Sequence, residues 1–141
     1  MKSRILVLAW LGMITSGCQT VPAPDTNSSA IPVRFLLTFD DGPSADPDDN
    51  TTLRILQQLD SNDVQPGTKA LFFVQTRNAD GGGSELGREL LHTKLRMGHA
   101  LGLHSATERG HVRHTLMPTG ELSTSLKQGA EDLRAIGRAV R

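Results

Sequence analysis

The chain contains no tyrosine, one cysteine and one tryptophan, and it has no excess of charge of either sign. The single cysteine, Cys18, excludes an internal disulfide. Its 15 basic and 15 acidic residues cancel, which argues against a general nucleic-acid or anionic-surface binder. We therefore expect no nucleic-acid partner. A length of 141 residues allows one domain at most.

Aromatic residues are scarce throughout the chain. Trp10 lies in an apolar run near the N-terminus, and the other aromatics are four phenylalanines on two predicted strands: Phe35, Phe39, Phe72 and Phe73. We expect all four phenylalanines in the core rather than as platforms on which sugars stack.

The N-terminal segment has the pattern of a targeting signal. Two basic residues precede the apolar run 5–14, which is too short to cross a bilayer as a helix. Small residues 15–17 then precede Cys18, and this segment resembles a bacterial lipobox, in which cleavage leaves the cysteine first and lipidated. Thr15 departs from that motif, which usually has an aliphatic residue there. We predict a lipoprotein signal peptide at 1–17, with ordinary cleavage and no lipid as the alternative.

The residues after the cysteine predict a tether and a location. Prolines, serines and an asparagine between residues 18 and 30 are typical of a flexible tether. A lipidated Cys18 would anchor the protein to a membrane of the bacterial cell envelope. The next residue is Gln19 rather than Asp, which by resemblance to sorted lipoproteins favours the outer membrane if the cell is Gram-negative.

Apolar runs and turn residues predict three strands that alternate with three helices. The strands are expected at about 33–39, 69–74 and 99–104. The first helix is expected to end near Ser61, and the second to run from a Ser84 cap to Gly98. A third helix is expected from the helical spacing of the apolar residues at positions 122, 126, 130, 133 and 136. A flexible loop is expected at 80–84. This alternation predicts an α/β fold with a parallel sheet.

Two adjacent carboxylates, Asp40 and Asp41, end the first predicted strand, and Gly42 and Pro43 then turn the chain. Neighbouring strand residues point to opposite faces, but at a strand end the backbone twists and both carboxylates can reach one cleft. Two adjacent acids repel each other, so a buried pair needs a cation or a shared proton. Asp, Gly and Pro are also common in turns, so these four residues taken alone fit a simple turn as well as they fit a functional pair of carboxylates.

Three segments, in order, resemble the motifs of a known family. Thr38–Pro43 reads Thr-Phe-Asp-Asp-Gly-Pro, Gly98–Ser105 begins Gly-His and ends Gly-Leu-His-Ser, and Lys69–Val74 lies between them as a strand. Together they resemble the polysaccharide deacetylase family, also called the NodB-homology or carbohydrate esterase 4 family, over about residues 31–140. The resemblance implies a partial domain at 31–141, an incomplete (β/α) barrel of about three βα units. Its active site is expected at the carboxyl ends of the strands.

The resemblance also implies a chemistry. A carboxylate and two imidazoles around an open position can hold a divalent metal, most simply zinc, and a further carboxylate can take a proton from water. The family uses this arrangement to hydrolyse N-acetyl groups on polymeric amino sugars. Carried over by position, Asp40 would be the general base, and Asp41 and His104 would be metal ligands. The implied substrate is an acetylated polysaccharide or peptidoglycan.

The third metal ligand does not follow directly from the resemblance. The family places a second histidine four residues after the first, where this chain has Glu108. We favour His111, because Arg109 and Gly110 can make the turn that brings it back; His114 and Glu108 are the alternatives. The remaining histidines are expected in structural or solvent-facing positions: His99 hydrogen-bonded in the fold, and His92 on the surface of a helix.

No segment matches the later motifs of the family, an Arg-Pro-Pro-Tyr-Gly-like oxyanion motif and segments that supply an Asp, a Trp and a His general acid. We therefore expect a natural truncation, a frameshift product or an incomplete reading frame, with the activity impaired. One alternative is a non-catalytic envelope lipoprotein that keeps a metal or glycan cleft. Another is a different metal-dependent amidase that acts on a small substrate.

Overall fold

A computed structural model describes residues 34–140 of the chain. The predicted signal peptide at 1–17, lipidation of Cys18 and the tether at 18–30 lie outside the described residues. Within the described part, no helix is both long enough and apolar enough to cross a membrane.

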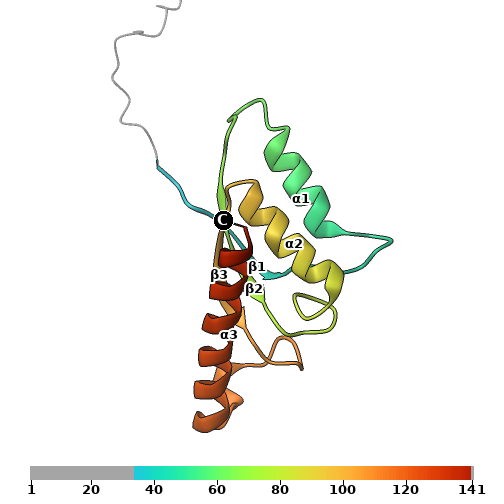
Figure 1. Cartoon of the computed structure of the whole chain (residues 1–141). Helices are drawn as coiled ribbons and strands as arrows, with labels where there is room; N and C mark the ends of the chain where they lie inside the picture. Colours follow the sequence, from blue (N-terminus) through green and yellow to red (C-terminus); the bar gives the residue numbers. More distant parts are fainter. Residues whose placement is uncertain (1–33, 141) are drawn as a thin grey trace, which may run out of the picture. The chain divides into compact units, whose positions relative to one another are not determined.

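The described residues form a three-stranded parallel sheet in the order β1-β2-β3 (Figure 1). The strands are β1 (Leu37–Gly42), β2 (Ala70–Gln75) and β3 (Ala100–Ser105). Since β2 pairs with both others, the outer edges of β1 and β3 have no strand partner among the described residues. The predicted parallel sheet is confirmed.

A helix follows each strand, as the leucine spacing predicts. The helices are α1 (Thr51–Asp60), α2 (Glu85–Arg96) and α3 (Thr119–Ala139), with the short 3-10 helix η1 (His114–Leu116) before α3. The side chains of Asn50 and Ser84 cap α1 and α2 by accepting a hydrogen bond from the backbone amide of the third residue of each helix. The predicted Ser84 cap is confirmed, and so is the end of α1 at Ser61.

The core lies between one face of the sheet and the helices. Phe72 and Val74 of β2 are fully buried there, and Phe72 stacks on Phe39 of β1 with ring centroids 5.0 Å apart. Helix side chains complete the cluster: Leu56, Leu59, Leu91 and Ile136. Burying each large apolar side chain contributes roughly 1.5–3 kcal/mol, so this cluster is the main source of stability for the sheet.

The first strand begins later than its apolar run predicts. β1 starts at Leu37, paired with Ala70, and Phe35 is 62 % exposed. The prediction that residues 34–36 belong to the strand and that Phe35 is buried was therefore wrong. The physical reason is that β2 begins at Ala70, so the residues before Leu37 have no neighbouring strand with which to pair.

The glycine-rich segment 80–84 is tightly packed, which corrects the prediction of a flexible loop. The backbone amide of Gly82 donates to the carbonyl of Gln75 over 2.9 Å, and Gly82 is buried. A Cβ on Gly83 would lie 2.4 Å from the carbonyl oxygen of Arg77. Glycine is needed here because backbone segments approach too closely for a side chain.

The two histidines assigned to structural or surface positions have different outcomes. His99 is buried, and its Nδ1 accepts a hydrogen bond from the backbone amide of Ala70 over 3.2 Å, which confirms the prediction. His92 on α2 is only 27 % exposed and lies 3.9 Å from a carboxylate oxygen of Glu89. The prediction of a solvent-facing His92 is therefore only partly right.

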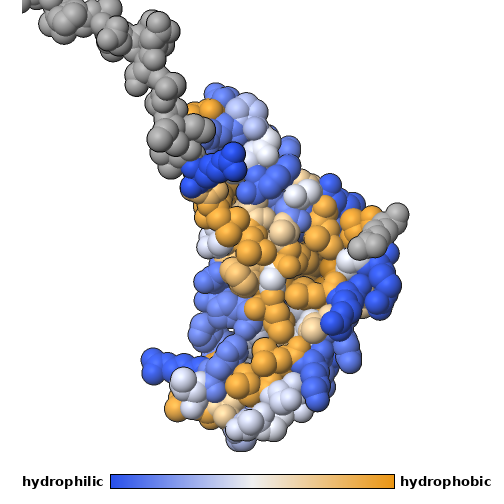
Figure 2. All heavy atoms as spheres, turned by 90° about the vertical axis from the view of Figure 1, so that its left-hand side faces the viewer, coloured by the Kyte–Doolittle hydropathy of each residue, from blue (hydrophilic) through white to orange (hydrophobic). Residues whose placement is uncertain are grey.

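The other face of the sheet is open. Leu71 and Phe73 alternate with the core residues of β2, so they point to this face, and both are only half-buried. The prediction of a core Phe73 was therefore wrong. Phe73 packs against β3 so closely that a Cβ on Gly102 would lie 2.7 Å from its ring. Figure 2 shows apolar atoms spread over the side of the molecule opposite α1 and α2. The carboxyl ends of the strands border this open face.

Candidate metal centre

A bulge in β1 sets the direction of the two adjacent carboxylates. Phe39 pairs with Phe72 and Gly42 with Val74, so three steps along β1 match two along β2 and one residue is extra. Asp41 has φ 64°, the left-handed conformation that Asp tolerates better than most residues. Regular alternation would point Asp41 to the same face as Phe39, toward the helices. The bulge instead turns its carboxylate toward the ends of the neighbouring strands.

A second bulge lies at the end of β3. Val74 pairs with Leu103 and Gln75 with Ser105, so His104 is the extra residue. The imidazole is 24 % exposed, and its Nδ1 lies 3.5 Å from Oδ1 of Asp41. Bulges are frequent beside active sites because they re-aim a side chain, and here two of them face each other across β2.

The loop after β3 returns the chain to this edge of the sheet. The hydroxyl of Thr107 donates to the carbonyl of Gly110 over 2.7 Å, and the hydroxyl of Ser105 accepts from the amide of Thr107. Gly110 has φ 77°, which glycine adopts without strain. The turn expected at residues 109–110 is therefore made, and His111 follows it with its ring beside Asp41.

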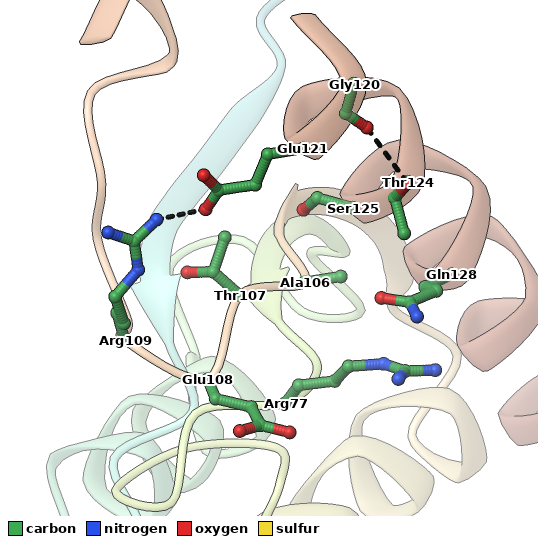
Figure 3. Close-up of a pocket in the computed structure, with 10 residues that line it drawn as sticks. All are labelled: Arg77, Ala106, Thr107, Glu108, Arg109, Gly120, Glu121, Thr124, Ser125 and Gln128. Carbon is green, nitrogen blue, oxygen red and sulfur yellow. Dashed lines mark hydrogen bonds and ion pairs between the residues drawn. The ribbon is translucent and has the colours of Figure 1, made fainter. Parts of the chain in front are cut away.

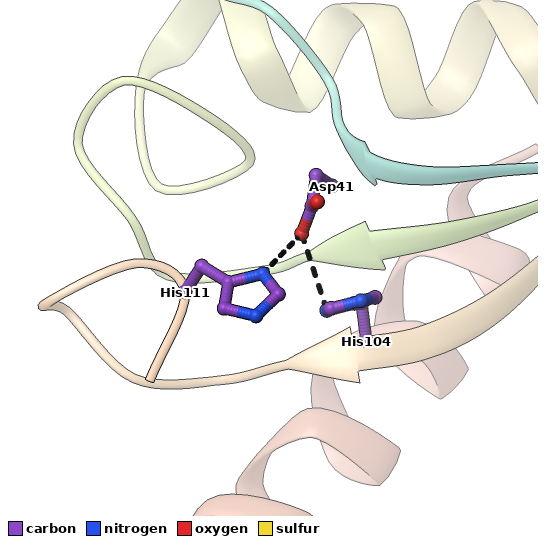
Figure 4. Close-up of side chains that lie close together, drawn as sticks. All are labelled: Asp41, His104 and His111. Atoms are coloured by element: carbon purple, nitrogen blue, oxygen red, sulfur yellow. Dashed lines mark hydrogen bonds and ion pairs between the residues drawn. The ribbon is translucent and has the colours of Figure 1, made fainter. Parts of the chain in front are cut away.

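Asp41, His104 and His111 form one cluster (Figure 4). One donor atom from each residue lies within 4.8 Å of those of the other two. Nδ1 of His111 is 2.6 Å from Oδ1 of Asp41, and the two imidazole centroids are 5.0 Å apart. These three residues come from β1, β3 and the loop that follows β3.

The charges of the cluster favour an ionised carboxylate. The hydrogen bond with His111 is the largest cause that holds the pKa of Asp41 below its usual value. Partial burial acts in the opposite direction, while the charges of His111 and His104 and a hydrogen bond from Gln75 add to the lowering. An ionised carboxylate with two imidazoles is a donor set that suits zinc and similar divalent ions. The residues present therefore fit a metal.

Three other sequence-predicted positions lie outside the cluster. Asp40 is exposed on β1, one residue before the ligand-like Asp41. Glu108 is exposed at the tip of the loop, and His114 is exposed on η1. Of the three residues considered for the third ligand, the structure brings His111, and neither Glu108 nor His114, into the cluster.

The sequence profile of the polysaccharide deacetylase family matches residues 30–139. The chain belongs to the polysaccharide deacetylase family. Neither the comparison with curated proteins nor the comparison with solved structures gave a match. The three βα units described here form a partial (β/α) barrel of the NodB type, and the cluster lies at the carboxyl ends of its strands.

This deacetylase domain also has a polar pocket (Figure 3). It has a volume of about 450 Å³ and is bounded by the loop after β3 and the first half of α3. An ion pair between Arg109 and Glu121 lies along one side. None of the three clustered residues lines the pocket, so it is not part of the candidate centre.

Sequence reasoning missed two buried polar residues near the ends of the strands of this deacetylase domain. Gln75 ends β2, is 5 % exposed and donates from Nε2 to Oδ1 of Asp41 over 3.4 Å. Lys94 of α2 is 1 % exposed, with Nζ 4.4 Å from the ring centroid of Phe72. Burial lowers the pKa of Lys94 to about 8. The only available signal for Gln75 was its place at the strand end; nothing in the pattern of α2 marks Lys94 as buried.

Proposed function

We propose that the chain binds a divalent metal, with zinc the expected ion, and hydrolyses N-acetyl groups on amino sugars of a polysaccharide or peptidoglycan. Asp41, His104 and His111 would hold the metal, and Asp40 would be the general base. The observation that carries the proposal is the convergence of three donor atoms within 4.8 Å at the carboxyl edge of a deacetylase-family sheet.

The roles of the residues follow from their positions. A metal held by two imidazoles and a carboxylate supplies a Lewis acid that polarises an amide carbonyl and lowers the pKa of water. Asp40 is exposed and lies next to Asp41 in the chain, and as general base it would take a proton from the attacking water. A substrate can approach the cluster from solvent, since the side chains of Asp41 and His111 are each 54 % exposed.

We expect slow turnover from these 141 residues alone. The three strands of residues 34–140 have unpaired outer edges and do not close a barrel around a substrate. The sequence has no match to the family motifs that supply the oxyanion contact and the general acid. Loss of a general acid costs about 10²–10⁴-fold in rate, and loss of an oxyanion donor costs about 10²–10³-fold.

Titration calorimetry with zinc tests the ligand set. The wild-type chain should bind one ion, and His104→Ala should abolish binding. His111→Ala should weaken zinc binding at least tenfold, whereas His114→Ala should leave it unchanged. His92→Ala is the matched control on α2. If His114→Ala abolishes binding and His111→Ala does not, the choice of third ligand is wrong.

Acetate release from an N-acetylated chitooligosaccharide or peptidoglycan fragment, with zinc added, tests the activity. We expect a low rate that Asp40→Asn removes. A rate equal to that of a complete deacetylase domain would contradict the expected impairment. A rate unchanged in Asp40→Asn would contradict the role of Asp40.

A non-catalytic envelope protein is the second candidate. The observation that favours it is the open sheet, because the described strands leave the face beside the cluster uncovered. This candidate predicts that the chain binds zinc or an acetylated glycan but releases no acetate above the metal-free rate. Acetate release that Asp40→Asn abolishes would exclude it.

We propose that the protein is a lipoprotein of the bacterial cell envelope, anchored through Cys18. The support is the basic start, the short apolar run and the small residues before the cysteine. Two or more acyl chains would give stable anchoring. Mass spectrometry of the mature N-terminus should find a lipidated Cys18 as the first residue. An unmodified cysteine or cleavage at another bond would refute the anchor.

A further inference from the structure

The side chain of Gln75 is held in one place although β2 contributes no member of the cluster. Its backbone carbonyl accepts from Gly82, and the amide of the next residue donates to the carbonyl of Ser105 over 2.9 Å. The backbone at Gln75 is therefore hydrogen-bonded to the glycine-rich segment on one side and to the end of β3 on the other. Its side chain is 95 % buried at the point where the bulged ends of β1 and β3 meet.

A second amide sets which end of Gln75 faces the carboxylate. Asn78 donates from Nδ2 to Oε1 of Gln75 over 3.0 Å, while Oδ1 of Asn78 accepts from the backbone amide of Asp80. An amide side chain has one donor end and one acceptor end. With Oε1 occupied by Asn78, Nε2 of Gln75 is the end that faces Oδ1 of Asp41 at 3.4 Å.

The same pair of amides supports the loop that carries His111. A Cβ on Gly110 would lie 3.0 Å from Nδ2 of Asn78 and 3.4 Å from Oε1 of Gln75, so the glycine backbone rests directly on both side chains. His111 is the next residue. Its position beside Asp41 therefore depends on the place that the amide pair gives to Gly110.

We propose that Gln75 and Asn78 are positioning residues that hold the Asp41 carboxylate on one side and seat the His111 loop on the other. The inference rests on the proposed metal centre, since its purpose is to bring these two ligands together before a metal binds. Two neutral amides suit this task, because they order a carboxylate without adding a charge that would compete with a cation. Partners that orient metal ligands typically change affinity by about 10–100-fold.

Two variants test the pair in different ways. Gln75→Leu removes both hydrogen-bonding ends. Asn78→Asp keeps the oxygen that accepts from Asp80 but has no N–H to give, so the Gln75 amide must turn its Nε2 toward residue 78. Its Oε1 then faces Asp41, and two acceptors oppose each other. Asn62→Asp is the matched control, because Asn62 also caps a turn through Oδ1, on the amides of Val64 and Gln65.

Two readouts separate positioning from general stability. The first is affinity for Co²⁺ and Zn²⁺ by titration calorimetry, with the visible spectrum of the Co²⁺ form as the signature of ligand geometry. The second is hydrogen exchange of the Gly110 amide in the metal-free chain, compared with that of Val74 in the core. We expect Gln75→Leu and Asn78→Asp to weaken metal binding by about 10–100-fold, to change the Co²⁺ spectrum, and to speed exchange at Gly110 but not at Val74. Asn62→Asp should change none of these.

The outcomes distinguish this inference from the proposed function. If the wild-type chain binds metal and both variants bind it equally well with an unchanged spectrum, the positioning role is refuted. If the wild-type chain binds no metal, the proposed function fails, and faster exchange at Gly110 in both variants would still support the seating of the loop. Unchanged exchange there would refute that role as well.

Discussion

Replacing Lys94 by Met measures what a buried ammonium costs this fold. Lys94 is 1 % exposed, and burial lowers its pKa from 10.5 to about 8. The difference, 10.5 − 8 = 2.5, corresponds to about 3 kcal/mol, since one pKa unit is about 1.4 kcal/mol. Methionine has a similar unbranched stem and similar helix propensity, so it should keep the packing on Phe72. At pH 7 we expect Lys94→Met to raise the free energy of unfolding by up to about 3 kcal/mol.

The gain should depend on pH in a defined direction. Below pH 8 the lysine is protonated in both the folded and the unfolded chain, so the cost of burying its charge is fully present. Between pH 8 and 10.5 the folded chain has released this proton while the unfolded chain still holds it, so wild-type stability rises with pH. Above pH 10.5 both forms are neutral and the cost is gone. The advantage of Lys94→Met should therefore shrink toward zero near pH 10.5.

Urea unfolding followed by far-ultraviolet circular dichroism provides the assay, because the only tryptophan, Trp10, lies outside the described residues. Curves at pH 7 and pH 10 give the difference between the wild type and Lys94→Met at each pH. Lys127→Met is the control, since Lys127 is an exposed lysine on a helix and its replacement should have a small effect at both pH values.

One result would refute this reasoning. If Lys94→Met destabilises the chain by more than about 1 kcal/mol at pH 7, the ammonium makes a net favourable interaction, which outweighs its desolvation. The obvious source is the end of β1, because a Cβ on Gly42 would lie 3.4 Å from Nζ. An advantage that stays constant from pH 7 to pH 10 would show instead that the gain comes from packing and not from charge.

Three further predictions concern the loop, a cap and an ion pair. Gly110→Ala should destabilise the chain by about 1–2 kcal/mol because of its positive φ, and should weaken zinc binding in calorimetry. Ser84→Ala should lose about 1 kcal/mol in urea unfolding, whereas Ser123→Ala, an exposed serine within α3, should lose little. Asp132→Asn should cost about 1.5–3 kcal/mol at pH 7, because the Arg77 guanidinium donates twice to this carboxylate. Burial alone would raise the pKa of Asp132, but its hydrogen bonds with Arg77 and Thr76 outweigh burial and the pKa is lowered overall. The stability that the ionised Asp132 contributes should therefore be lost as the pH falls below 3.8.

Local sequence signals predicted the elements whose ends are set by local contacts. Ser84 caps α2, and Ser61 ends α1, because a helix end needs only its own neighbours to satisfy its backbone groups. The start of β1 could not be predicted in this way. Its apolar run begins before Leu37, and only the position of Ala70 on the next strand decides where pairing begins.

Burial of polar side chains was the least predictable feature. Lys94 has the helical neighbours of an ordinary surface lysine, but its side chain turns into the core and its Nζ lies over the ring of Phe72. Gln75 follows an apolar strand and could equally have begun an exposed loop. Its role becomes visible only when Asp41 and Asn78, which are 34 and 3 residues away in sequence, are seen on either side of its amide.

The arrangement of the candidate centre depends on two departures from regular strand geometry. On a regular β1, Asp41 would face the helices with Phe39, on the side where Nζ of Lys94 lies near Gly42. A carboxylate there would pair with a buried ammonium and would be unable to reach a metal. The extra residue in β1 moves the carboxylate to the strand end, and the extra residue in β3 places His104 opposite it. Because of the two bulges, the side chains of Asp41 and His104 meet at the ends of the strands, although regular alternation would separate them. Gln75 of β2 donates a hydrogen bond to the Asp41 carboxylate from the strand between them.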